Sequence, residues 1–104
     1  MYIKITSNFI ETANEFIRCI RLFGGEFNEW YVGLTRDSKH SFLEIHQVDL
    51  LEKHWILSNE SSDAMILYAR KFLVELGCQN KRSLDMDNSN RIYLYQISEN
   101  TRED

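Results

Sequence analysis

The sequence predicts a single α+β domain in which a small mixed β-sheet of three to four strands is packed by two long helices and one short helix. Two segments carry apolar residues at helical spacing, and each of them ends at glycine. Runs rich in β-branched and aromatic residues lie before, between and after these segments. Because 104 residues provide for about one core, we expect one domain at residues 1–97 and a polar, solvated tail at residues 98–104.

The first expected elements are a strand at residues 2–6 and a long helix near residues 8–23. Ser7 or Asn8 can cap this helix. The Gly24-Gly25 pair ends it, as expected where the chain needs a positive φ. Its apolar stripe consists of Phe9, Ile10, Ala13, Phe16, Ile17, Ile20 and Phe23.

The remaining elements follow in the same alternation. We expect strands at residues 30–35, 54–58 and 91–97, a short helix near residues 38–46 and a second long helix at residues 62–76. The predicted core consists of Phe9, Phe16, Ile17, Ile20, Val32, Leu34, Phe42, Ile56, Ile66, Phe72, Leu73, Ile92 and Leu94.

Composition narrows the classes of function. Acidic residues outnumber basic ones by 16 to 12, and the formal net charge of −4 argues against tight generic binding to phosphate backbones. Cys19 and Cys78 fit neither a disulfide-rich scaffold nor a metal motif, so we expect reduced, buried thiols. No apolar run reaches the roughly 18 residues that span a bilayer, so the sequence predicts a soluble cytoplasmic protein with no membrane partner.

The order of the motifs resembles one known family. "EWYVGLTRD" is followed by a short helix ending at His46, a strand beginning Trp55-Ile56, a long helix ending Gly77-Cys78 and a tyrosine-rich last strand. Over roughly residues 9 to 97 this resembles the GIY-YIG endonuclease superfamily, in particular small bacterial members in which a helix precedes the YVG strand. The resemblance implies metal-dependent phosphodiester cleavage, in which a motif Tyr positions water, an Arg stabilises phosphate charge and a Glu holds one divalent ion.

Two positions depart from what that resemblance implies. Tyr31 keeps the motif tyrosine and Gly33 the glycine, but the "GIY" tripeptide has no clear copy. Ser41 stands where the Arg is expected, and serine supplies no fixed positive charge. Arg70 stands where the metal-binding Glu is expected, and Arg does not ligate a cation. The resemblance therefore implies a degenerate site without catalytic residues, metal or cofactor, formed by Tyr31, Gly33, His40, Ser41, His46 and Arg70.

Each of these residues also has a plainer interpretation. Tyr31 and Trp30 suit a strand that packs one side chain on each face of a sheet. His46 suits the negative end of a short helix, which favours a structural cap over a general base. Asp85 and Asp87 lack the glycine and distal Glu of a calcium loop, which favours a polar turn.

Three functions stay open, in the following order. The first is a non-catalytic interaction protein, such as an inhibitor or regulator in a mobile-element or phage-defence conflict, which binds a protein partner around Tyr31, His40 and Arg70 as a monomer or small homo-oligomer. The second is nucleic-acid binding through Arg70, Lys71, Lys81, Arg82 and Arg91, for which a solvated surface is the default interpretation. The third is a working metal-dependent endonuclease in which the missing ligand is replaced by Glu75, Glu44 or Asp63.

Overall fold

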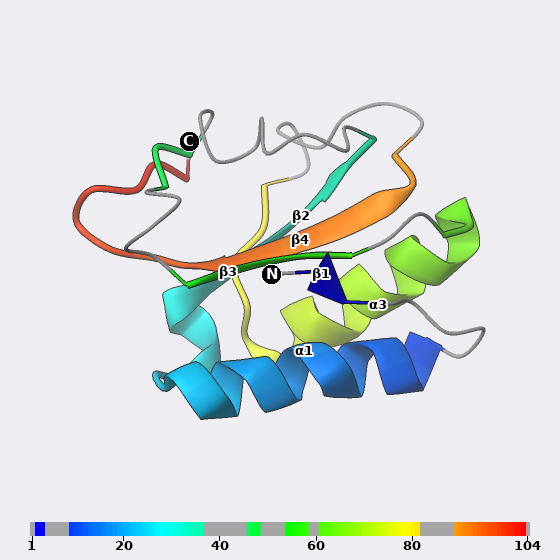
Figure 1. Ribbon diagram of the computed structural model, residues 1–104, viewed down its shortest axis with the longest axis horizontal. Coiled ribbons are helices and arrows are strands. Elements are labelled where there is room, and N and C mark those ends of the chain that lie inside the picture. Colours follow the sequence, from blue (N-terminus) through cyan, green and yellow to red (C-terminus); the bar gives the residue numbers. More distant parts are fainter. Residues whose placement is uncertain are drawn as a thin grey trace.

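A four-stranded mixed sheet forms the centre of the computed structural model, which describes residues 2–3, 9–36, 46–48, 54–58, 61–81 and 89–103 (Figure 1). Its strands are β1 (Tyr2–Ile3), β2 (Trp30–Thr35), β3 (Trp55–Ser58) and β4 (Arg91–Gln96). Their order across the sheet is β1-β3-β4-β2. β1 runs parallel to β3, while β4 is antiparallel to both of its neighbours, so the predicted mixed sheet is confirmed.

Both long helices, α1 (Phe9–Phe23) and α3 (Asp63–Leu76), cover the same face of this sheet (Figure 1). The Oγ of Ser62 caps α3 by accepting a hydrogen bond from the Met65 amide at 3.3 Å. Gly24, with φ of +96°, follows α1, and Gly77, with φ of +122°, follows α3. The predicted glycine stops of both helices and the start of α3 are therefore confirmed, whereas Ser7 and Asn8, the predicted caps of α1, lie outside the described residues. A short 3-10 helix, η1 (Phe27–Glu29), leads into β2.

Side chains alternate across the sheet and create two separate apolar clusters. Trp30, Val32 and Leu34 of β2 face the helices. They pack there with Phe16, Cys19, Ile20, Ile56, Ile66, Ala69, Leu73, Cys78, Ile92 and Leu94. Tyr31 faces the other way and forms the second cluster with Val48, Leu57, Tyr93 and Tyr95.

Most of the predicted core is confirmed on the helix side. Ile17 packs against this cluster and is partly buried, and Phe72 is also partly buried, so neither of these predicted core residues is well exposed. Both lie at the margins of the helical stripes, where one side of the chain meets solvent. The predicted helix near residues 38–46 lies outside the described residues except for His46. Phe9, Phe42, Asp85 and Asp87 are also outside the side chains that the structure describes.

The second face of the sheet is covered by residues 46–48 and by residues 98–103, which we call the C-terminal segment (Figure 1). The Arg102 amide donates to the His46 carbonyl at 2.6 Å, and the Thr101 side chain is only 8% exposed. The segment is therefore attached at Thr101 and Arg102, although the side chains of Glu99, Asn100 and Arg102 are exposed, as the composition suggests for a solvated tail. The physical reason is that two buried polar groups on this face, the Tyr95 hydroxyl and the His46 ring, find hydrogen-bond partners in Glu103 and the Arg102 carbonyl.

Within the described part of the chain, no helix is long and apolar enough to cross a membrane.

Candidate functional site

Tyr31, the motif tyrosine, is fully buried on the sheet face away from the helices. After α3 the chain turns at Gly77 and runs beside β2, where Val32 N donates to the Gln79 carbonyl at 2.8 Å. This path brings Lys81 to the tyrosine. The Tyr31 hydroxyl accepts from the Lys81 amide at 3.0 Å and donates to the Lys81 carbonyl at 3.3 Å. The single proton of this hydroxyl is thus engaged by the backbone.

His46 lies at the centre of the same face and is 1% exposed. Its Nε2 is 2.8 Å from the Tyr93 hydroxyl, and its Nδ1 is 2.9 Å from the Tyr95 hydroxyl and close to the Arg102 carbonyl. A carbonyl only accepts hydrogen bonds, so Nδ1 carries a proton, and in the neutral imidazole Nε2 accepts from Tyr93. His46 is thus fully engaged in structural hydrogen bonds.

The Tyr95 hydroxyl completes this network by donating to Oε2 of Glu103 at 2.8 Å. Burial, followed by the hydrogen bond and negative charge of Glu103, raises the pKa of Tyr95 well above its usual range. The hydroxyl therefore stays protonated at neutral pH and offers no phenolate to a reaction.

The rings of this tyrosine–histidine cluster, which consists of Tyr31, His46, Tyr93 and Tyr95, pack against one another. The Tyr31 centroid lies 4.6 Å from that of His46, 5.3 Å from that of Tyr95 and 6.2 Å from that of Tyr93. These are ordinary packing distances for aromatic side chains. The four side chains therefore fill the space between them by packing against one another.

Gly33 has a packing role in this cluster. A Cβ built on Gly33 would lie 2.3 Å from both Cζ and the hydroxyl oxygen of Tyr93. The absence of a side chain thus lets the Tyr93 ring cross the strand and reach His46. This contact gives the motif glycine a structural explanation.

The structure brings only part of the predicted site together. Tyr31 packs on His46 and Gly33 lies against Tyr93 of the same cluster, whereas Arg70 lies on α3, on the opposite side of the sheet from Tyr31. His40, Ser41 and Arg82 lie outside the described residues. The expected grouping of Tyr31 with Arg70 fails because Tyr31 alternates away from the neighbours that face the helices.

The residues of the predicted basic surface are placed differently from one another. Lys71 is exposed on α3, and Lys81 is exposed beside Tyr31. Arg91 is partly buried, and its Nη1 donates to the Ser58 carbonyl at 3.1 Å. Arg91 thus has a structural role, because it bonds β4 to β3.

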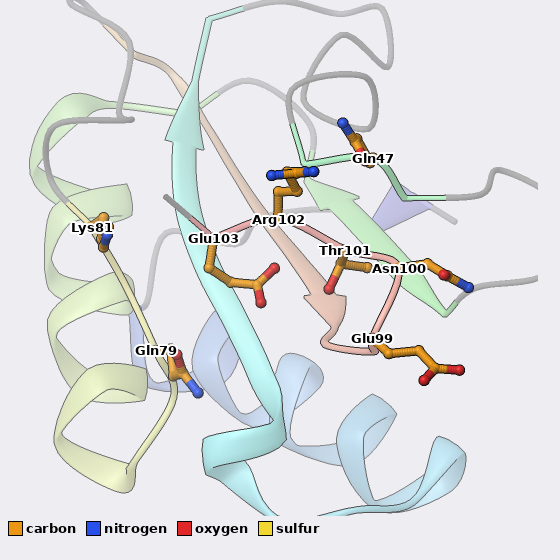
Figure 2. Close-up of a pocket in the computed structure, with 8 residues that line it drawn as sticks. All are labelled: Gln47, Gln79, Lys81, Glu99, Asn100, Thr101, Arg102 and Glu103. Atoms are coloured by element: carbon orange, nitrogen blue, oxygen red, sulfur yellow. The ribbon is translucent and has the colours of Figure 1, made fainter.

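An open hollow of about 650 Å³ lies on the outer side of the cluster. Figure 2 shows Gln79 and Lys81 on one side of β2 and the C-terminal segment on the other. The lining residues are Gln47, Gln79, Lys81, Glu99, Asn100, Thr101, Arg102 and Glu103. Two cations face two carboxylates around this hollow, so it favours neither an anion nor a cation by charge alone.

Other reactive side chains are also withdrawn from solvent. Burial raises the pKa of Cys78 to about 12, and burial followed by the charge of Glu15 raises that of Cys19. Both are free, buried thiols, as predicted. His54 is exposed and stacks on Phe23 with centroids 4.1 Å apart. Among the described residues, no three His, Cys, Asp or Glu side chains gather as a metal site.

Sequence reasoning missed Tyr93, Tyr95, Thr101 and Glu103. Tyr93 and Tyr95 carry a signal, because "RIYLYQI" places its two tyrosines two positions apart and thus on one face of a strand. Thr101 and Glu103 carry no such signal.

No protein-family model, curated protein or solved structure matches this chain. The resemblance to the GIY-YIG superfamily therefore stays a prediction that depends on the motifs of the chain itself.

Proposed function

We propose that this chain is a non-catalytic interaction protein on a degenerate GIY-YIG-like scaffold, which acts by binding another protein. The observation that carries the proposal is the closed state of the tyrosine–histidine cluster. Its motif tyrosine is fully buried, and the hydroxyl is held by the backbone of Lys81. A tyrosine that positions an attacking water has to meet that water and the phosphate.

The position of Arg70 supports the loss of catalysis independently. Phosphodiester cleavage requires a metal and a cation to act on the same phosphate as the motif tyrosine. Arg70 stands where the metal-binding carboxylate is expected, and it lies on the helix side of the sheet while Tyr31 lies on the other.

Charge supports a protein as the partner. The chain carries a formal net charge of −4, and binding to nucleic acid depends on accumulated Lys and Arg. Acidic surfaces instead compete for the Lys and Arg residues of another protein, and they steer its approach. An inhibitor or regulator of a nucleic-acid-processing or defence complex would use this chemistry.

The test is affinity capture with the tagged chain from extracts of its source, with and without prior digestion of all nucleic acid. We expect one protein to be recovered in comparable amounts from both extracts and at both low and high salt. Recovery of nucleic acid alone, lost at high salt and weakened by Arg70→Ala and Arg82→Ala, would contradict the proposal and indicate a nucleic-acid-binding module.

A further inference from the structure

The hollow beside the tyrosine–histidine cluster has walls that are fixed to the sheet. Its volume of about 650 Å³ lies within the range of sites that hold a small molecule or a few side chains. The Gln79 amide donates to the Trp30 carbonyl at 2.8 Å on one side, and the Arg102 amide donates to the His46 carbonyl at 2.6 Å on the other (Figure 2). Because main-chain hydrogen bonds hold both walls, the hollow is preformed, as ligand sites usually are.

Glu103 is the charged group of this hollow whose position is best defined. Four charged side chains line the hollow, and three of them are exposed. The fourth, Glu103, is partly buried, and its Oε2 accepts a hydrogen bond from the Tyr95 hydroxyl at 2.8 Å. A carboxylate that a neighbour already holds loses less side-chain freedom when a ligand binds, so Glu103 is suited to anchor one.

The carboxylate of Glu103 also keeps unused acceptor capacity. Within the described part of the chain, the recorded ion pair lies on α1 and does not involve the hollow. Lys81 and Arg102, the two described cations of the hollow, therefore do not pair with Glu103, although all three line it. The hydrogen bond from Tyr95 engages one oxygen, whereas an ionised carboxylate accepts through both. Glu103 can therefore accept further hydrogen bonds from a cation that enters the hollow.

Gln79 supplies a second fixed acceptor on the opposite wall. Its Nε2 donates to the Asn28 carbonyl at 2.8 Å, which holds the amide group and leaves its Oε1 to accept. Acceptors on both walls suit a ligand with several donors rather than an anion. A guanidinium group has five N–H donors in a planar fork, so it can bind a carboxylate through two of them and a further acceptor through another. The more compact ammonium of lysine has three donors and no such fork.

We propose that the hollow binds an arginine side chain of the protein partner, with Glu103 as the carboxylate that pairs with it and Gln79 as a further acceptor. This inference rests on the proposed function, and it names the surface and the chemistry through which the partner is bound. An arginine that binds phosphate in a nucleic-acid-processing protein has the same donors, so the hollow can occupy it. Lys81 and Arg102 are exposed in the same hollow, and they favour a partner in which an acidic residue neighbours that arginine.

The test is a nuclear magnetic resonance titration of the full-length, isotope-labelled chain with two blocked tripeptides. One is acetyl-Gly-Arg-Gly-amide, and the other carries citrulline, which has nearly the shape of arginine but no charge. We expect the arginine peptide to shift the main-chain amide signals of Gln79, Arg102 and Glu103 in a saturable way, with a dissociation constant on the order of 1 mM. The citrulline peptide should bind about tenfold more weakly, because its hydrogen bonds to the carboxylate lack the charge of the guanidinium.

Substitutions locate the site. Glu103→Gln keeps an oxygen that can accept from Tyr95 but removes the charge. It should weaken binding of the arginine peptide by about tenfold while circular dichroism stays unchanged. Glu75→Gln is the matched control, because Glu75 is exposed on α3, across the sheet from the tyrosine–histidine cluster, and it should leave binding unchanged.

Several results would overturn this inference. They are the absence of a saturable shift, equal binding of the arginine and citrulline peptides, and equal binding of the arginine peptide to Glu103→Gln and to the unaltered chain. Preferential binding of acetyl-Gly-Glu-Gly-amide, weakened by Lys81→Ala, would overturn it as well, because it would indicate an anion site.

The two proposals fail separately. If the arginine peptide does not bind but the chain captures a protein from extracts, the arginine site is wrong and the proposed function stands. If the arginine peptide binds and no protein is captured, the proposed function is wrong and the arginine site stands.

Discussion

At the residue scale, His46 connects the two tyrosines of β4 to the C-terminal segment. Replacing it by alanine leaves the hydroxyl of Tyr93 without its imidazole partner and opens a cavity among the rings. We expect His46→Ala to lower the free energy of unfolding by about 2–4 kcal/mol, measured by urea denaturation. His54→Ala is the matched control, because His54 is exposed, and it should cost less than about 1 kcal/mol. Equal losses of unfolding free energy for the two variants would contradict a structural role for the His46 hydrogen bonds.

Gly33 yields a second prediction at this scale. A methyl group there would meet the Tyr93 ring at 2.3 Å, so Gly33→Ala must displace that ring from His46. We expect a loss of about 1–3 kcal/mol in thermal or urea unfolding. The same substitution in a Tyr93→Ala background should cost much less, because the ring is gone. Additive losses would show that the contact is unimportant.

The two buried acids Cys78 and Tyr95 predict a loss of stability in alkali. The folded-state pKa of Cys78 is raised from 9.0 to about 12, so the thiolate forms more readily in the unfolded chain. The buried thiol contributes fully to the free energy of unfolding below pH 9. This contribution falls by about 1.4 kcal/mol per pH unit as pH rises toward 12. Tyr95 acts in the same direction above pH 10.0, its unperturbed value. Cys78→Ala should flatten the pH dependence of urea unfolding between pH 9 and 10, and an unchanged slope would refute this account.

At the element scale, the C-terminal segment is held by a few polar contacts. Thr101 Oγ1 accepts from the Ser98 amide at 3.0 Å and donates to the Ser98 carbonyl at 2.9 Å. We expect Thr101→Ala to lower stability by about 1–2 kcal/mol and to speed amide hydrogen exchange at Arg102. Asn100→Ala, at an exposed neighbouring position, is the control. It should change the free energy of unfolding by no more than about 0.5 kcal/mol and leave the exchange rate at Arg102 nearly unchanged. Slow exchange at Arg102 in both variants would mean that this turn does not hold the segment.

The elements themselves differ in how far the sequence predicts them. Both long helices carry their own signals, with Ser62 capping one and glycines ending both, so their bounds follow from local rules. The C-terminal segment has the composition of a solvated tail. Its attachment to the sheet depends on contact with His46, which is 56 residues from Arg102 in sequence, and no local pattern encodes such a pairing.

For the molecule as a whole, the candidate site was only partly predictable. Tyr31, Gly33 and His46 were identified from motif order, and in the structure Tyr31 packs on His46 while Gly33 lies against the ring of Tyr93. Arg70 was grouped with them by motif order too, but strand alternation turns Tyr31 away from the helix that carries Arg70. The alternation of Tyr31 with Trp30 and Val32 was visible in the sequence. Knowing which face meets the helices required the tertiary structure.

Cleavage is the measurement that tests the central claim of a closed, non-catalytic site most directly. Purified chain and its Tyr31→Phe variant are incubated with plasmid, single-stranded DNA and RNA in Mg²⁺ and in Mn²⁺. If the proposed degenerate scaffold is right, the missing metal ligand and the missing phosphate-stabilising cation would each remove several kcal/mol of transition-state stabilisation, so we expect no metal-dependent product from either protein. Metal-dependent cleavage by the unaltered chain that Tyr31→Phe abolishes would contradict the account and restore the endonuclease.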